Sequence, residues 1–184
     1  MVNTMENKKN EIVVFSEGFL HWDNEIYRCA LGRSGFKENK REGDGATPAG
    51  IFKLREVWYR ADKMERPKTK LPVREIKEND GWSDDLKSPN YNRPVKLPTE
   101  GSHEKLFRED EIYDLVIPLG YNDEPPVPGL GSAIFMHIAR PTYSPTEGCV
   151  ALNKEDLLKI LETCDSETTI RIKPLVALVP PTQA

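Results

Sequence analysis

Cysteine, histidine and long apolar runs are all scarce in this sequence. The 184 residues include three cysteines and three histidines. The cysteines are odd in number and form no metal-type pair, which is typical of a reducing compartment with at least one free thiol. No apolar run reaches the roughly 20 residues that span a bilayer, and the N-terminal stretch has no signal-peptide pattern. We therefore expect no membrane segment and a cytoplasmic protein, or a periplasmic one if a leader has been removed.

Positive charge is not in excess either. Lysine and arginine number 26 against 30 aspartates and glutamates, a formal net charge of −4. Without a basic stripe to neutralise phosphates, the composition excludes nucleic acid as a main partner. The length and the high charged fraction indicate a globular domain that is large enough to bury a real core.

The pattern along the chain predicts a mainly β fold with one principal helix. Apolar and alternating runs predict strands at residues 12–15, 26–31, 51–59, 112–119, 132–139, 149–152 and 168–173. Asn153 caps a predicted helix that runs to about residue 163. Residues 60–111 are irregular, and because structureless loops of that length are uncommon, we expect an ordered excursion over one face of the sheet. One domain then spans residues 11–175, between a flexible N-terminus (1–10) and a C-terminal tail (176–184).

One stretch, FMHIARPTYSPTEGCVAL at residues 135–152, carries side chains suited to catalysis. His137 ends one predicted strand and Cys149 begins the next. An imidazole within hydrogen-bond reach of the thiol would make it a nucleophile for acyl transfer. Gly148 would admit a carbonyl substrate, and the amides of Gly148 and Cys149 would face the developing oxyanion. The alternative is a hairpin in which both side chains only pack, and a metal site lacks further ligands nearby.

Two motifs together resemble the YkuD-type L,D-transpeptidase catalytic domain. They are His137 followed by Thr146-Glu147-Gly148-Cys149, and the upstream run GATPAGIF at residues 45–52. Phrases such as GWSDDLKSPNYNRPVKLP and GSAIFMHIARP look like one branch of that family, and the resemblance covers about residues 12–173. It implies a β-sandwich with an ordered excursion over the cleft, and neither cofactor nor metal. It also implies that Cys149 is the nucleophile and that His137 is the base, oriented by a backbone carbonyl.

The sequence departs from the family pattern next to the cysteine. The commoner motif is Ser-His-Gly-Cys followed closely by Arg, whereas here Glu147 replaces the histidine and residues 150–152 contain no arginine. Arg140 on the connecting loop, and after it Arg93 in the excursion, are candidates to bind a substrate carboxylate instead. The other candidates for substrate contacts are Thr146, His103 and Tyr121, although a structural hydrogen bond for His103 and simple packing for Tyr121 stay open.

The resemblance implies a peptidoglycan stem tetrapeptide or muropeptide as the partner. The cysteine would attack the carbonyl of a diamino acid joined to D-alanine, and water or an amine would resolve the thioester. We favour hydrolysis, by an L,D-carboxypeptidase of peptidoglycan recycling, because a cytoplasmic protein meets recycled muropeptides. An L,D-transpeptidase that forms cross-links and a non-catalytic muropeptide-binding module are the alternatives.

Overall fold

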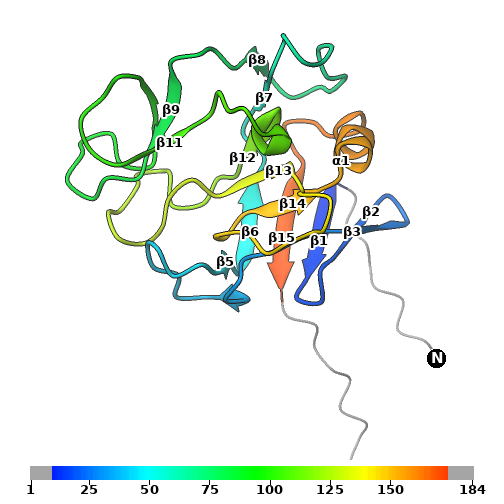
Figure 1. Ribbon diagram of the computed structural model, residues 1–184. Coiled ribbons are helices and arrows are strands. Elements are labelled where there is room, and N and C mark those ends of the chain that lie inside the picture. The colour runs from blue at the N-terminus through cyan, green and yellow to red at the C-terminus, as the bar shows by residue number, and fades with distance from the viewer. Residues whose placement is uncertain (1–9, 174–184) are drawn as a thin grey trace, which may run out of the picture.

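The computed structural model describes residues 10–173 and is built mainly from β-strands (Figure 1). The first five-stranded sheet has the order β3 (Glu25–Arg28), β2 (Phe19–Trp22), β1 (Glu11–Phe15), β15 (Thr169–Lys173) and β6 (Gly50–Lys53). The second has the order β14 (Val150–Leu152), β13 (Phe135–Ile138), β12 (Leu115–Pro118), β7 (Val57–Tyr59) and β8 (Val73–Glu75). The helical elements of the described part are α1 (Lys154–Leu161) and the 3-10 turn η1 (Glu111–Tyr113). No helix in residues 10–173 has the length and apolarity needed to cross a membrane.

The main hydrophobic core lies between the two large sheets. Strand residues alternate between faces, and one face of each sheet contributes to a single buried cluster. Ile12 and Ile170 come from the first sheet, and Ile117 and Met136 come from the second. Helix α1 adds Leu157 and two neighbouring apolar residues to the same cluster. The predicted β-sandwich with one principal helix is therefore confirmed.

The opposite face of the second sheet is buried as well, beneath the predicted excursion. Residues 60–111 are ordered and contain β8 and a three-stranded sheet of β10 (Pro94–Lys96), β9 (Asp80–Ser83) and β11 (His103–Lys105), which lies to the upper left in Figure 1. Trp82 of β9 packs edge-on against Phe135 of β13, with ring centroids 5.1 Å apart. These rings and Cys149 belong to a second hydrophobic cluster. The excursion thus forms a covering layer, or roof, over the face of the second sheet that carries Cys149.

The predicted strand at residues 51–59 is wrong as a single element. It is split into β6 and β7, which lie in different sheets, and Leu54 between them forms an isolated bridge with Leu119. The chain crosses between the sheets at this point, and Arg55 is tied there to Asp123 at 2.8 Å. An alternating pattern reports burial and not the sheet to which a strand belongs. The pattern therefore did not reveal the crossing.

The first sheet also contains a hairpin that the sequence pattern missed. Strands β2 and β3 are antiparallel and joined by Asp23 and Asn24, both in the left-handed region with φ of 48° and 63°. Two consecutive left-handed residues of this type form the tight turn that matches strand twist. The Asp-Asn pair was the available signal. The short parallel pair of β4 (Phe36–Lys37) and β5 (Thr47–Pro48) completes the strands, while the predicted N-terminal and C-terminal tails lie outside the described residues apart from Asn10.

The N-cap of α1 allows a test of the prediction that Asn153 caps this helix. The Asn153 side chain accepts a hydrogen bond from the Asp156 amide at 2.8 Å, as predicted for a cap. Replacing Asn153 with alanine should lower the free energy of unfolding by about 1 kcal/mol, because that amide loses its partner. In thermal unfolding this corresponds to a decrease in Tm of about 2 to 4 °C. Asn153→Ser keeps an acceptor oxygen and should recover most of the loss; equal Tm values for the alanine variant and the wild type would contradict the capping role.

Candidate active site

The positions of Cys149 and His137 follow from the pairing of β13 with β14. The two strands are parallel, and His137 lies opposite Ala151 in their register. Cys149 precedes Ala151 by two residues and therefore emerges on the same face of the sheet as His137. The amide of Phe135 donates to Cys149 Sγ at 3.4 Å, which places the thiol at the beginning of β13. A hairpin over residues 135–152 is thus wrong, because the connecting loop returns the chain to pair in parallel.

Cys149 and His137 line one cavity of about 450 Å³ under the excursion. Arg140 and Thr146, both predicted to contact substrate, line it too. The rest of its wall is rich in charge and includes Lys40, Glu42, Asp84, Glu104, Arg108 and Glu147. A concave site with a few convergent polar groups is typical of small-ligand binding. Residues 10–173 contain no group of three or more His, Cys, Asp or Glu side chains arranged to hold a metal ion.

His137 is a buried, neutral imidazole with a defined tautomer. Its Nδ1 lies 2.9 Å from the Ile138 carbonyl oxygen, and because a carbonyl only accepts, Nδ1 carries the hydrogen. The other nitrogen, Nε2, is then the one able to take a proton. The Tyr113 ring and the imidazole pack in a T-shaped arrangement, with centroids 5.3 Å apart. Burial lowers the pKa of His137 to about 4, and the charges of Arg108 and Arg140 act in the same direction.

Cys149 is held as a neutral thiol. Its Sγ donates to the Ala133 carbonyl oxygen at 3.3 Å while it accepts from the Phe135 amide. Burial raises the pKa of the Cys149 thiol to about 12, against the effect of the Phe135 amide. No hydrogen bond joins Cys149 to His137 within residues 10–173. The structure therefore contains a neutral thiol and a neutral imidazole in one cavity, not a thiolate–imidazolium ion pair.

Gly148 is required by a close backbone approach. Its φ is 139°, and a Cβ at this position would lie 2.7 Å from the carbonyl oxygen of Ala46. Ala46 belongs to the upstream GATPAGIF motif, so the two motifs that are far apart in sequence meet at this contact. The Gly148 amide donates to Thr146 Oγ1 at 3.1 Å, and the Thr146 hydroxyl donates to the Cys149 carbonyl at 2.7 Å. The Gly148 amide is thus engaged within the turn and does not serve as the predicted oxyanion donor in this conformation.

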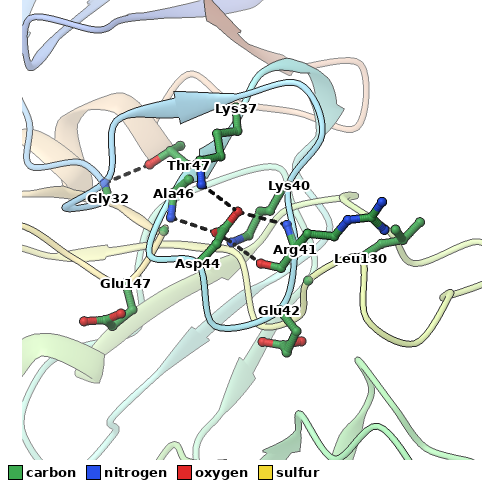
Figure 2. A network of polar contacts seen from close by, with 12 residues as sticks. Gly32, Lys37, Lys40, Arg41, Glu42, Asp44, Ala46, Thr47, Leu130 and Glu147 are labelled. Carbon is green, nitrogen blue, oxygen red and sulfur yellow. Dashed lines mark hydrogen bonds and ion pairs between the residues drawn. The ribbon is translucent and has the colours of Figure 1, made fainter.

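The loop at residues 37–47 is fixed by Asp44, a residue that sequence reasoning missed (Figure 2). Asp44 accepts from Lys40 Nζ at 2.8 Å and from the amides of Arg41 and Ala46 at 2.9 Å each. Burial opposes ionisation of Asp44, yet these hydrogen bonds hold its pKa well below the usual range. The loop therefore presents Ala46 to Gly148 and carries Lys40 and Glu42 into the cavity wall. The available signal was the Asp-Gly turn four residues after a lysine.

Three of the predicted substrate contacts lie outside this cavity. Arg93, which immediately precedes β10, lines a separate cavity of about 220 Å³. His103 Nδ1 contacts the Gly101 carbonyl oxygen at 3.0 Å, which is a local structural contact. Tyr121 donates its hydroxyl hydrogen to the Leu130 carbonyl and packs on Phe52, with ring centroids 5.4 Å apart. Of the predicted substrate contacts, the structure brings Arg140 and Thr146 together with Cys149 and His137.

Further charged side chains lie at or next to the cavity, and those of the excursion were not singled out from the sequence. Glu104 accepts from the Tyr113 hydroxyl at 3.1 Å, and burial raises its pKa. Arg108 holds Asp110 through two bonds of 2.7 and 2.8 Å, while Arg140 lies 3.7 Å from the same carboxylate. Glu147, which replaces the commoner histidine, forms an exposed ion pair with Arg33 at 3.0 Å. The positions of the charged residues of the excursion depend on tertiary folding, and no periodic pattern in the sequence indicated them.

Comparison with known proteins gives this geometry a family context. Similar solved structures include the helical cell shape determining protein Pgp2 from Campylobacter jejuni, with a TM-score of 0.44, 13% identity and coverage of 91% of this chain and 48% of that one. An L,D-transpeptidase from Mycobacterium smegmatis has a TM-score of 0.38 at 11% identity, with 89% of this chain and 58% of that one covered. L,D-transpeptidase 3 from Mycobacterium tuberculosis, solved with a faropenem-derived adduct, has a TM-score of 0.42 at 12% identity, with 89% and 59% covered.

The chain therefore spans about half to three fifths of the length of these structures. No curated protein sequence matches it significantly. The family model of YkuD, described as the L,D-transpeptidase catalytic domain, matches residues 7–172. Since that match covers nearly the whole sequence, including both His137 and Cys149, the chain belongs to the YkuD family of L,D-transpeptidase catalytic domains.

Proposed function

We propose that this protein is a cysteine-dependent acyl-transfer enzyme that cleaves the bond between an L-diamino acid and D-alanine in peptidoglycan stem tetrapeptides. Water is the acceptor in this proposal, so the enzyme is an L,D-carboxypeptidase. The observation that carries it is the shared cavity of Cys149 and His137, in which the Ile138 carbonyl leaves Nε2 as the basic nitrogen. Membership of the YkuD family supports the substrate class.

The first half of the reaction forms a thioester. Cys149 Sγ attacks the carbonyl carbon of the diamino acid while its proton passes to His137 Nε2. The C–N bond to D-alanine then breaks, and the imidazolium returns the proton to the leaving amine. Because the resting thiol and imidazole are both neutral, proton transfer has to accompany attack. The thiol first turns its hydrogen away from the Ala133 carbonyl, which accepts it in the resting state.

The second half hydrolyses the thioester. His137 Nε2 takes a proton from water as the water oxygen attacks the thioester carbonyl, and it returns this proton to Sγ as the C–S bond breaks. The tripeptide leaves as a carboxylic acid, which ionises by releasing its remaining proton to solvent. Arg140 is our candidate to bind the D-alanine carboxylate. Arg108 already donates two hydrogen bonds to Asp110, so the 3.7 Å contact between Arg140 and Asp110 is the weaker one. Arg140 can therefore exchange this contact for the substrate carboxylate.

The size of the cavity supports water as the acceptor. About 450 Å³ lies in the lower part of the range for small-ligand sites and suits the end of one stem peptide. A cross-linking L,D-transpeptidase, the second candidate, also has to hold the amine of a neighbouring stem. Under the hydrolytic proposal the enzyme works on recycled muropeptides in the cytoplasm, where free tetrapeptide and water are available and an intact wall is not.

A non-catalytic muropeptide-binding module is the candidate from a different class. The arguments for it are the resting thiol, which is buried with its hydrogen on a carbonyl, and the altered residue Glu147. The arguments against it are the cavity shared by Cys149 and His137 and the oriented imidazole, since a binding module needs neither a basic Nε2 nor a thiol in the same cavity.

Product analysis separates these functions. Mass spectrometry of a stem tetrapeptide incubated with the protein should show tripeptide and free D-alanine. Cys149→Ala should reduce that rate on the order of 10³-fold or more, because the nucleophile is gone. Cys164→Ala, which changes a buried cysteine of the main core, is the matched control and should retain activity. Exchange of D-alanine for an added D-amino acid would instead favour the transpeptidase, and unchanged but bound tetrapeptide would favour the binding module.

The pH dependence tests the neutral pair. A protonated His137 cannot accept the thiol proton, so kcat/KM should be lost as the pH falls through about 4, not near the ordinary histidine value of 6.5. The same lowered pKa makes folding less favourable as the pH falls below 6.5 towards 4, because the unfolded chain then binds the additional proton. Circular dichroism at each pH separates the two effects. An acid limb near 6.5 in folded protein would contradict a buried neutral imidazole.

A further inference from the structure

Asn92 is a buried side chain of the excursion that is hydrogen-bonded to the segment leading into β13. This residue is 3% exposed and adopts a left-handed conformation with φ of 53°. Its Nδ2 donates to the carbonyl oxygens of Tyr121 at 3.1 Å and Asn122 at 2.7 Å. Its Oδ1 accepts from Trp82 Nε1 at 2.9 Å and from the Ala133 amide at 3.0 Å. The side chain thus uses both ends to join the roof of the cavity to the segment that leads into β13.

The residue that Asn92 holds is the one that contacts the thiol. Ala133 adopts a φ of 53°, a conformation that is uncommon for a residue with a side chain and needs support from its surroundings. Asn92 accepts from the amide of Ala133, and the carbonyl of Ala133 accepts the hydrogen of Cys149 Sγ at 3.3 Å. Two residues further on, the Phe135 amide donates to the same sulfur. The backbone of residues 133–135 therefore supplies the thiol with both a hydrogen-bond acceptor and a hydrogen-bond donor.

The neighbouring residue Tyr91 supports the same segment from the same side. Its hydroxyl bonds to Glu42 and accepts from the Gly131 amide at 3.1 Å. Ser132 donates to Glu42 at 2.7 Å. Tyr91 binds Gly131 and Asn92 binds Ala133, so Asn92 is the member of this pair that contacts the residue next to the thiol.

We propose that Asn92 is a positioning residue for the nucleophile: through Ala133 it fixes the direction of the Cys149 thiol and keeps its hydrogen on a backbone carbonyl until substrate arrives. This inference rests on the proposed function, in which Cys149 attacks the substrate. Loss of Asn92 frees the Ala133 peptide to leave its left-handed conformation. The thiol then loses the acceptor that favours its neutral form, and the sulfur loses its fixed place next to the cavity.

Alkylation of Cys149 tests the inference without any peptidoglycan substrate. Iodoacetamide modification is followed by mass spectrometry from about pH 6 to about pH 10, with Cys29 and Cys164 as internal references. In Asn92→Ala, Cys149 should react about fivefold faster at neutral pH, the size expected for the loss of one hydrogen bond, with its profile moved to lower pH. Modification of the two reference cysteines should be unchanged. An unaltered Cys149 rate and profile in folded Asn92→Ala would overturn the inference.

The matched control is Asn122→Ala. Asn122 is also a left-handed asparagine, and it binds Val127 and Gly131 in the adjacent loop without contacting Ala133. This variant should lower Tm while the Cys149 profile stays that of the wild type. Equal shifts in both variants would show a merely structural role and overturn the inference.

A conservative variant covers the case in which Asn92→Ala does not fold. Asn92→Asp keeps the oxygen that accepts from Ala133, so its Cys149 profile should not move to lower pH; a shift to lower pH would overturn the inference. With tetrapeptide, Asn92→Ala should lower kcat while KM changes little, since Asn92 does not line the cavity of Cys149. If the wild type proves inactive while the alkylation results hold, the proposed function fails and the positioning of the thiol stands.

Discussion

The parallel pairing of β13 with β14 is the constraint on which the site depends. It places Cys149 and His137 on the same face of the second sheet, and it does so only because the loop after β13 returns the chain to the start of that strand. Parallel strands are rarely left open to water on one face. Here the main core covers one side, and the other is covered by Trp82 and Leu106 of the excursion and by Tyr113 of η1. The roof over the cavity is therefore part of what makes this pairing stable.

Burial beneath that roof sets the electrostatics of the site. A low-polarity environment disfavours both charged forms, so it raises the pKa of Cys149 and lowers that of His137. The two shifts move apart, and a resting ion pair is not formed. The neutral thiol is a weaker nucleophile than a thiolate, so it is protected from unwanted reactions. Once substrate excludes water from the cavity, nearby charges act more strongly on the reacting groups.

The sequence pattern singled out Cys149 and His137, which the structure places in one cavity, whereas most of the other residues around that cavity could not be predicted. The histidine before the loop and the Thr-x-Gly-Cys run are each defined by residues close together in sequence, so a sequence motif can identify them directly. Arg93 was proposed as a substitute for the missing arginine, His103 because it matches the branch pattern and Tyr121 as an aromatic wall of the cleft, but none of the three lines the cavity. Glu104 and Lys40 reach it from segments without periodic pattern. The predicted strand at 51–59 failed for a related reason, since alternation does not tell which of two sheets receives a residue.

Two anchors hold Cys149 in place, and they bear on the residue at which the sequence departs from the commoner motif. On one side, Gly148 fits against the Ala46 carbonyl, and Asp44 fixes the loop that presents it. On the other, Asn92 fixes Ala133, whose carbonyl contacts the thiol. Neither anchor uses the side chain at position 147, which points to Arg33 at the exposed rim. Because that position takes no part in holding Cys149, a glutamate is compatible with the same backbone, and its effect is confined to the charge at the rim of the cavity.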